Sequence, residues 1–208
     1  MIKIKICGIT NLEDALVAVE AGADMLGFNF YRPSARFIEP KTARTIIEKL
    51  PAQIMAVGVF VNERDPKTVA GIADETGIAG LQLHGDESPE FCRELSGRYV
   101  IKVLRVDQHF RPEHVTAYQT DAIMLDAFDP HLRGGTGRVV DWSMAAETRP
   151  LVDRLFLSGG LSPENVAAAI TTVGPFAVDA CSRLESAPGR KDLARMRSFI
   201  AAARAAGL

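Results

Sequence analysis

Eight short runs of apolar and β-branched residues recur along the 208-residue chain, with stretches of helical periodicity between them. They lie at residues 2–6, 24–30, 54–61, 80–84, 99–104, 122–126, 154–159 and 176–180. The runs recur roughly every 20–30 residues, which is the length of one β-strand followed by one helix. This alternation predicts an α/β protein with a parallel sheet, because parallel strands need a crossover connection between them.

Two architectures fit that alternation, a doubly wound open sheet and a (β/α)8 barrel. The count of eight runs favours the barrel, and no G-x-G-x-x-G follows the first run. The barrel is also favoured by where chemistry falls, since barrel active sites lie at the C-terminal ends of strands. Polar or reactive residues stand at or near these ends, namely Cys7, Asn29, Asn62, His84, Arg105, Asp126, Ser158 and Asp179. We therefore predict a single-domain (β/α)8 TIM barrel over residues 1–208 with its active site at that rim.

Composition excludes several classes of protein. The chain is 47% hydrophobic and 24% charged with a formal net charge of −2, which gives no basic footprint for nucleic acid. No uncharged apolar run approaches the roughly 18 residues of a membrane span. Three scattered cysteines are too few for a disulfide framework and lack zinc-site spacing. We expect a reduced, cytoplasmic protein without a metal site, and the sequence is compatible with a monomer or a homodimer.

Three Asp-Pro or Ser-Pro pairs mark expected helix starts. Asp65-Pro66, Ser88-Pro89 and Ser162-Pro163 each combine a good N-cap residue with a proline at the first helical position. The third pair follows Gly159 and Gly160, so backbone N–H groups at that helix start are candidates to bind a phosphate.

Cys7 closes the first apolar run and is followed directly by a glycine. Strand parity places Lys3, Lys5 and Cys7 on one face. If the isoleucines between them pack against outer helices, this face points into the barrel, with Cys7 at its mouth. A lysine one layer below favours a thiolate. The alternative is an inert, small, buried cysteine.

Asp126 ends the sixth run after four apolar residues. A carboxyl group at a barrel mouth can act as a general acid if desolvation raises its pKa. The alternative is a helix cap or an ordinary loop carboxylate.

Glycine-rich segments follow the last runs. The segment 133–138, RGGTGR, can approach a ligand closely or form a moving loop. Gly159, Gly160 and Ser182 follow the seventh and eighth runs, whose loops commonly bind phosphate in barrels. Two ordinary turns are the alternative.

The motifs KICGIT, GFNFYRPSARFI, LQLHGDE, MLDAFDP, GGTGRVVDW, LSGGLSPENV and VDACSRLESAPGRKD stand in this order between residues 3 and 192. In order and spacing the chain resembles the phosphoribosylanthranilate isomerases of tryptophan biosynthesis. The resemblance implies a cofactor-free barrel that acts on a small-molecule phosphosugar. The implied reaction is the Amadori rearrangement of N-(5′-phosphoribosyl)anthranilate to 1-(2-carboxyphenylamino)-1-deoxyribulose 5-phosphate.

The resemblance also implies roles for single residues. The family's catalytic base falls on Cys7 and its catalytic acid on Asp126. The arginine that binds the anthranilate carboxylate falls on Arg36, and an aspartate near the sugar hydroxyls falls on Asp179. Gly160 and Ser182 match the phosphate-binding loops. His84, at the end of the fourth run, is either a substrate contact or a structural histidine.

One position departs from the family pattern. Arg183 stands where the family commonly has glycine, either paired with Glu185 or added to the phosphate site. Other phosphosugar barrels remain alternatives, namely an indole-glycerol-phosphate synthase that uses a catalytic lysine, a ribulose-phosphate epimerase and the histidine-pathway isomerase. A non-catalytic phosphosugar or anthranilate sensor is an alternative of another class.

Overall fold

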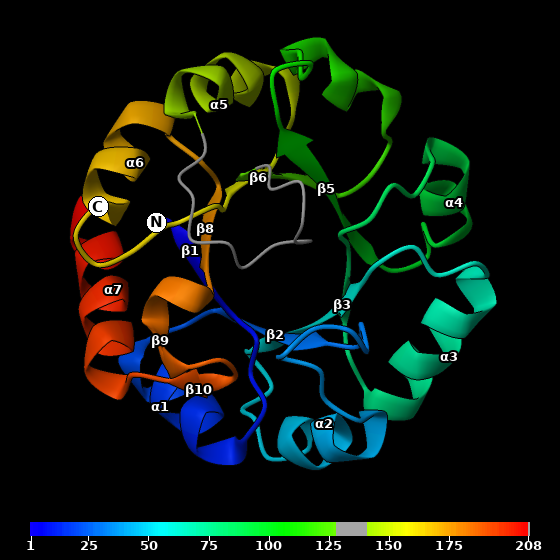
Figure 1. Cartoon of the computed structure of the whole chain (residues 1–208), viewed down its shortest axis with the longest axis vertical. Helices are drawn as coiled ribbons and strands as arrows, with labels where there is room; N and C mark the ends of the chain where they lie inside the picture. The colour runs from blue at the N-terminus through cyan, green and yellow to red at the C-terminus, as the bar shows by residue number, and fades with distance from the viewer. Residues whose placement is uncertain (128–140, 208) are drawn as a thin grey trace.

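A closed barrel of parallel strands forms the centre of the computed structural model, which describes residues 1–127 and 141–207. Within those residues eight strands close it in sequence order, β1 to β8 (Figure 1). Their bounds are Lys3–Cys7, Met25–Asn29, Met55–Phe60, Gly80–Leu83, Tyr99–Val106, Ala122–Ala127, Leu155–Leu157 and Ala177–Ala180. The barrel prediction is confirmed, and the doubly wound sheet is wrong because β1 pairs with both β2 and β8.

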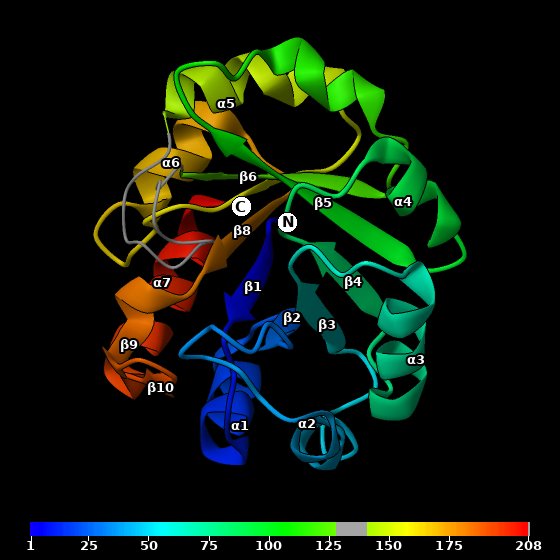
Figure 2. The same cartoon turned by 45° about the vertical axis from the view of Figure 1, so that its right-hand side comes forward.

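Helices surround the strands (Figures 1 and 2). The α-helices are α1 Leu12–Ala21, α2 Pro40–Ile47, α3 Pro66–Thr76, α4 Pro89–Glu94, α5 Trp142–Thr148, α6 Val166–Val173 and α7 Leu193–Ala206. Short 3-10 helices η1 Pro112–Ala117, η2 Arg149–Leu151 and η3 Ser182–Leu184 complete them, with a hairpin of β9 Glu185–Ala187 and β10 Arg190–Lys191. The hairpin follows η3, so it lies just beyond the end of β8.

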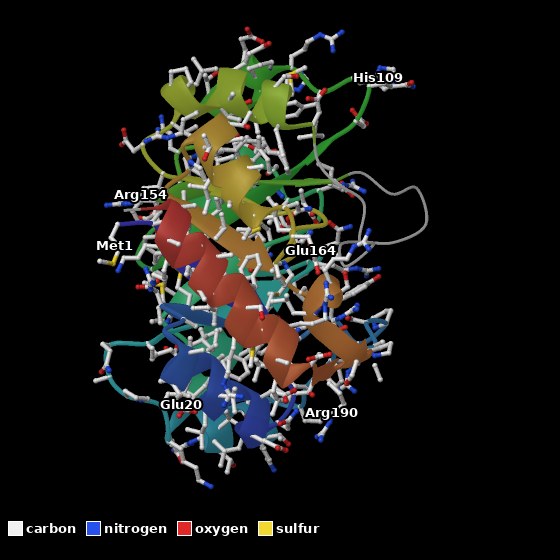
Figure 3. The ribbon with its side chains drawn as sticks, turned by 90° about the vertical axis from the view of Figure 1, so that its left-hand side faces the viewer. Met1, Glu20, His109, Arg154, Glu164 and Arg190 are labelled. Atoms are coloured by element: carbon white, nitrogen blue, oxygen red, sulfur yellow. The ribbon has the colours of Figure 1, made fainter. Side chains whose placement is uncertain are left out.

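The core has two layers, as strand alternation requires. Outward-facing residues, including Ile4 and Ile6 of β1, are fully buried in the apolar layer between strands and helices. A smaller cluster fills the barrel interior, with Val57, Met124 and Phe156 at 0% exposure. α7 closes the ring against α1 and α6 (Figure 3). Among the described residues, no helix has the length and apolar character needed to cross a membrane.

Two of the three expected helix starts are confirmed. The side chains of Asp65 and Ser88 accept hydrogen bonds from backbone N–H groups of the first turns of α3 and α4. The third prediction is wrong, because α6 begins only at Val166. The Asn165 side chain accepts a hydrogen bond of 2.8 Å from the Ser162 backbone N–H, which holds the intervening residues in a turn. The Gly159-Gly160 loop therefore leads into a turn rather than directly into a helix.

Candidate active site

A buried ion pair forms the floor of the site. Lys5 of β1 and Asp179 of β8 are register partners, and Lys5 Nζ donates to Asp179 Oδ1 at 2.8 Å. Both side chains lie inside the barrel, and Ser158 Oγ donates to the other Asp179 oxygen at 3.2 Å. The inward placement of Lys5 is as predicted. Lys3 is not buried with it: its side chain is 47% exposed because β1 starts there.

Cys7 lies one layer above this pair. The pKa of its thiol is lowered from an ordinary 9.0 to about 6, chiefly by a hydrogen bond with the Cys181 thiol. Burial opposes this effect, whereas the charge on Lys5 adds to it. Gly8 has φ +76°, and a Cβ there would lie 2.9 Å from Cys181 Sγ, so the glycine after Cys7 lets the two thiols approach.

Asp126, the residue before the last of β6, belongs to a chain of three polar side chains. Its Oδ2 atom lies 3.0 Å from His84 Nε2, and its Oδ1 accepts a hydrogen bond from the Ala127 backbone N–H at 2.9 Å. The other ring nitrogen of His84, Nδ1, lies 2.9 Å from Gln82 Nε2. Gln82 lies on β4 and His84 directly follows its last residue, so continuing the strand parity directs both side chains inward. His84 therefore has a structural partner as well as a place at the site.

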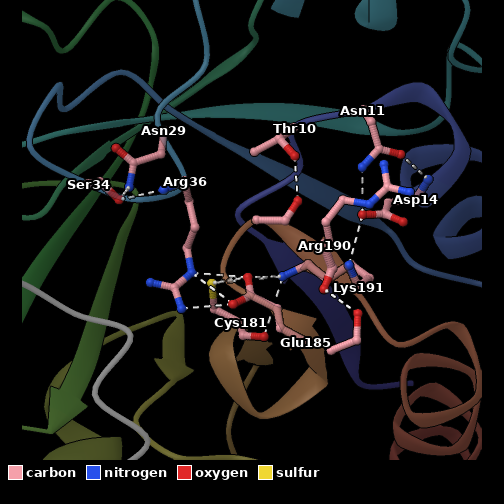
Figure 4. Close-up of polar contacts among 12 residues, drawn as sticks. Thr10, Asn11, Asp14, Asn29, Ser34, Arg36, Cys181, Glu185, Arg190 and Lys191 are labelled. Carbon is pink, nitrogen blue, oxygen red and sulfur yellow. Dashed lines mark hydrogen bonds and ion pairs between the residues drawn. The ribbon is translucent and has the colours of Figure 1, made fainter.

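Arg36 is held by an internal carboxylate (Figure 4). Its Nε donates to both Glu185 oxygens at 3.0 and 3.1 Å, and its Nη2 donates to Oε2 at 2.8 Å. Lys191 Nζ, buried in the β9–β10 hairpin, donates to Glu185 Oε1 at 3.0 Å. Burial opposes ionisation of Glu185, but Arg36 and Lys191 together hold its pKa below the usual range. All three bonds from Arg36 use Nε and Nη2, so the Nη1 edge is outside this clamp.

Two hollows open at the C-terminal ends of the strands, and the loops after β7 and β8 line the second of them. It is bordered by Gly159, Gly160, Ser182 and Arg183. Gly159 has φ +82°, and a Cβ there would lie 2.7 Å from the Ala127 backbone nitrogen, so another residue at this position would strain the loop.

The two hollows adjoin. The first contains Cys7, Arg36 and His84, and both are lined by Asp126, Ser158, Asp179 and Cys181. The structure thus brings together all eight residues selected from the sequence: Cys7, Arg36, His84, Asp126, Gly159, Gly160, Asp179 and Ser182. The glycine-rich segment 133–138 lies outside the described residues.

A family model for N-(5′-phosphoribosyl)anthranilate (PRA) isomerase matches residues 4–202, which is nearly the whole chain. The chain belongs to the PRA isomerase family. A PRA isomerase of Geobacter sulfurreducens is 50% identical over 200 residues, covering 96% of this chain and 97% of that protein. This PRA isomerase therefore acts in tryptophan biosynthesis, and the synthase, epimerase, histidine-pathway and sensor alternatives are set aside.

Solved structures of PRA isomerases show the same barrel. One, of monomers generated from the dimeric enzyme of Thermotoga maritima, aligns with a TM-score of 0.89 at 43% identity and covers 99% of this chain and 100% of that one. Another, with the same score, identity and coverage, is a complex with reduced 1-(o-carboxyphenylamino)-1-deoxyribulose 5-phosphate.

Sequence reasoning missed two features of this PRA isomerase site. The contact between Cys7 and Cys181 was not foreseen, although continuing the parity of β8 two residues past Asp179 places Cys181 beside the barrel mouth. The clamp of Glu185 on Arg36 was also missed. Its second cation, Lys191, arrives through the β9–β10 hairpin, and no periodicity in the sequence signals that return.

Proposed function

We propose that Cys7 is the general base and Asp126 the general acid of the PRA isomerase reaction. The observation that carries this proposal is the setting of the Cys7 thiol, which has Cys181 beside it and the buried Lys5 cation below it. A thiol in this setting is mostly ionised at neutral pH, whereas an ordinary cysteine is not. Asp126 lines the same hollow, so a substrate bound there meets both groups.

The reaction then needs only proton transfers. Asp126 in its protonated form gives its proton to the furanose ring oxygen, and the C1–O bond breaks as the ring opens to a protonated Schiff base. The Cys7 thiolate takes the proton from C2, and the electron pair of that C–H bond moves to form an enolamine. Tautomerisation of the enolamine gives the ketone. Contacts with His84 and the Ala127 backbone hold the Asp126 carboxyl toward the hollow.

The ends of the substrate carry charges that match the two hollows. We assign the anthranilate carboxylate to Arg36, whose guanidinium suits a planar carboxylate. Glu185 binds the Nε and Nη2 atoms of Arg36, which leaves Nη1 to donate to the anthranilate carboxylate. The 5′-phosphate is assigned to Gly159, Gly160 and Ser182, and the sugar hydroxyls to Asp179. His84 lines the same hollow as Arg36 and Cys7.

Two further properties of the chain are also proposed. The T. maritima relative is a dimeric enzyme, and we propose that this chain also forms a homodimer. All three cysteines are free thiols, which supports a location in the reducing cytoplasm. Light scattering after size-exclusion chromatography tests the first proposal, and cell fractionation tests the second.

Two substitutions test the acid and the base. PRA is generated in situ, and its conversion is followed by the loss of anthranilate-conjugate fluorescence. Cys7→Ser and Asp126→Asn should each lower kcat by about 100-fold or more, the usual worth of a positioned acid or base. Binding of the reduced product analogue should change little. Cys92→Ser, on α4, is the matched control and should keep wild-type turnover. Full activity in either site variant contradicts its assignment.

A further inference from the structure

Cys7 is the last residue of β1, and Cys181 is the first residue after the adjacent parallel strand β8. The register of β1 and β8 pairs Lys5 with Asp179 and Ile6 with Ala180, so the next step along both chains is Cys7 and Cys181. Adjacent strands lie about 4.8 Å apart, and disulfides join Cα atoms about 4.4–6.8 Å apart. Both thiols line the same hollow, and each shifts the pKa of the other. No large backbone movement is needed to join them.

We propose that Cys7 and Cys181 form a reversible redox pair, in which a hydroperoxide oxidises Cys7 and Cys181 converts the product into a disulfide. This site adds oxidative control to the isomerase. The disulfide itself follows from the geometry alone, whereas the loss of isomerase activity rests on the proposed role of Cys7 as the base.

The first step takes place at Cys7. The thiolate sulfur attacks one oxygen of the hydroperoxide, an S–O bond forms and the O–O bond breaks. Cys7 becomes a sulfenic acid, oxidised by two electrons, while the peroxide leaves as an alkoxide or hydroxide that takes a proton from water. Cys7 suits this step because it is ionised and opens to the hollow. Cys92 is a poor target, since burial raises the pKa of its thiol to about 11.

The second step takes place at Cys181. While Cys7 is a thiolate, the hydrogen bond to it and burial keep the pKa of Cys181 high. Oxidation removes that negative charge, and Lys191 Nζ lies 3.9 Å from Cys181 Sγ, where it favours ionisation. The Cys181 thiolate then attacks the Cys7 sulfur, the S–S bond forms, and the S–O bond breaks. Hydroxide leaves and takes up the released proton as water.

The pair also limits damage. A sulfenic acid without a neighbouring thiol is oxidised further to sulfinic acid, which thiol reductants do not reverse. A disulfide stops at the reversible stage and is reopened by a dithiol through exchange. With Cys181 present, oxidation of the base can therefore be reversed, whereas without it the loss is permanent.

The test compares the intact wild-type enzyme with Cys181→Ser after treatment with hydrogen peroxide at neutral pH. Serine keeps a hydroxyl that can donate to Cys7 but cannot form a disulfide. In the wild type we expect a mass loss of two hydrogen atoms, a peptide linking Cys7 to Cys181, and full recovery of activity with dithiothreitol. In Cys181→Ser we expect a gain of oxygen on Cys7 and no recovery with dithiothreitol.

Controls separate the possible outcomes. Cys92→Ser should form the same linked peptide as the wild type, and Cys7→Ser should form none. A wild-type enzyme that gains oxygen on Cys7 without forming the linked peptide overturns the proposal, as does equal recovery of activity in Cys181→Ser. If the disulfide forms but turnover of PRA persists, the redox pair stands and the assignment of Cys7 as the base fails.

Discussion

Replacement of Cys181 by alanine tests the electrostatic account of the base. The groups that set the ionisation of the Cys7 thiol are Cys181, Lys5, Asp179 and Lys191, and the hydrogen bond with Cys181 contributes most. With the pKa of Cys7 at about 6, roughly 90% of the thiol is ionised at pH 7, against roughly 1% at the ordinary 9.0. Cys181→Ala leaves Lys5 in place, so we expect an intermediate pKa, about midway between 6 and 9.0, and a fall in kcat/KM at pH 7 of about 4- to 10-fold as the ionised fraction drops.

The pH profile is the decisive assay. A general base must be deprotonated to act. Wild-type kcat/KM should therefore be constant at pH values above the pKa of Cys7 and should decrease as the pH falls through about 6. In Cys181→Ala this acidic limb should move to higher pH, and the two enzymes should converge under alkaline conditions. Cys181→Ser is the matched control: its hydroxyl can still donate to Cys7, so its limb should move less. The ultraviolet absorbance of the thiolate gives the same pKa without turnover.

A limb that stays near pH 6 in Cys181→Ala would refute this reasoning. It would mean that Lys5 alone holds the thiolate, or that the limb belongs to another group. Ionisation of Cys7 measured by absorbance separates these two cases. Because a base with a higher pKa is also stronger, a rate at a single pH understates the shift, and the position of the limb is the quantity to compare.

Four further substitutions test other parts of the site. Arg36→Ala should raise KM by about 10- to 100-fold with a smaller effect on kcat, and Glu185→Gln should have a milder effect in the same direction; steady-state kinetics measures both. Lys5→Met should lower the free energy of unfolding by about 3–5 kcal/mol because it leaves Asp179 buried without its cation, and denaturant unfolding should show partial recovery when Asp179→Asn is added. Gly159→Ala should cost about 1–3 kcal/mol of stability through its positive φ and raise KM; an unchanged KM would argue against the phosphate loop.

Most of the fold could be predicted because it depends on local patterns. Apolar runs alternating with helical periods give the barrel, and Asp65 and Ser88 cap helices through neighbours only two or three residues away. The start of α6 was mispredicted because Ser162-Pro163 has the local pattern of a helix start. The Asn165 side chain instead accepts from the Ser162 N–H and donates to the Gly160 carbonyl, and the residues between form a turn before α6. The local pattern does not show where such a turn gives way to the helix.

The residues of the site also divide into those that a local pattern predicts and those that it does not. Cys7, Asp126 and Asp179 could be found because each is the last or the next-to-last residue of an apolar strand, and barrel closure brings strand ends together wherever they stand in the sequence. The partners of Arg36 could not be found by this rule. Arg36 and Glu185 are 149 residues apart, and Lys191 reaches them from a hairpin outside the barrel. Contacts made by loops after the last strand follow no period, so sequence alone left the state of Arg36 open.

Strand parity links the stability of the barrel to its chemistry. One step of two residues along β1 leads from Lys5 to Cys7, and the same step from Asp179 leads to Cys181. The lower pair is a buried salt bridge, whose charges are retained only because each neutralises the other. The upper pair lies at the mouth, where Cys181 lowers the pKa of Cys7 and Cys7 raises the pKa of Cys181. Lys5 pairs with Asp179 in the lower layer and lowers the pKa of Cys7 in the upper one. Removal of this buried cation should therefore lower both the stability of the barrel and the ionised fraction of Cys7.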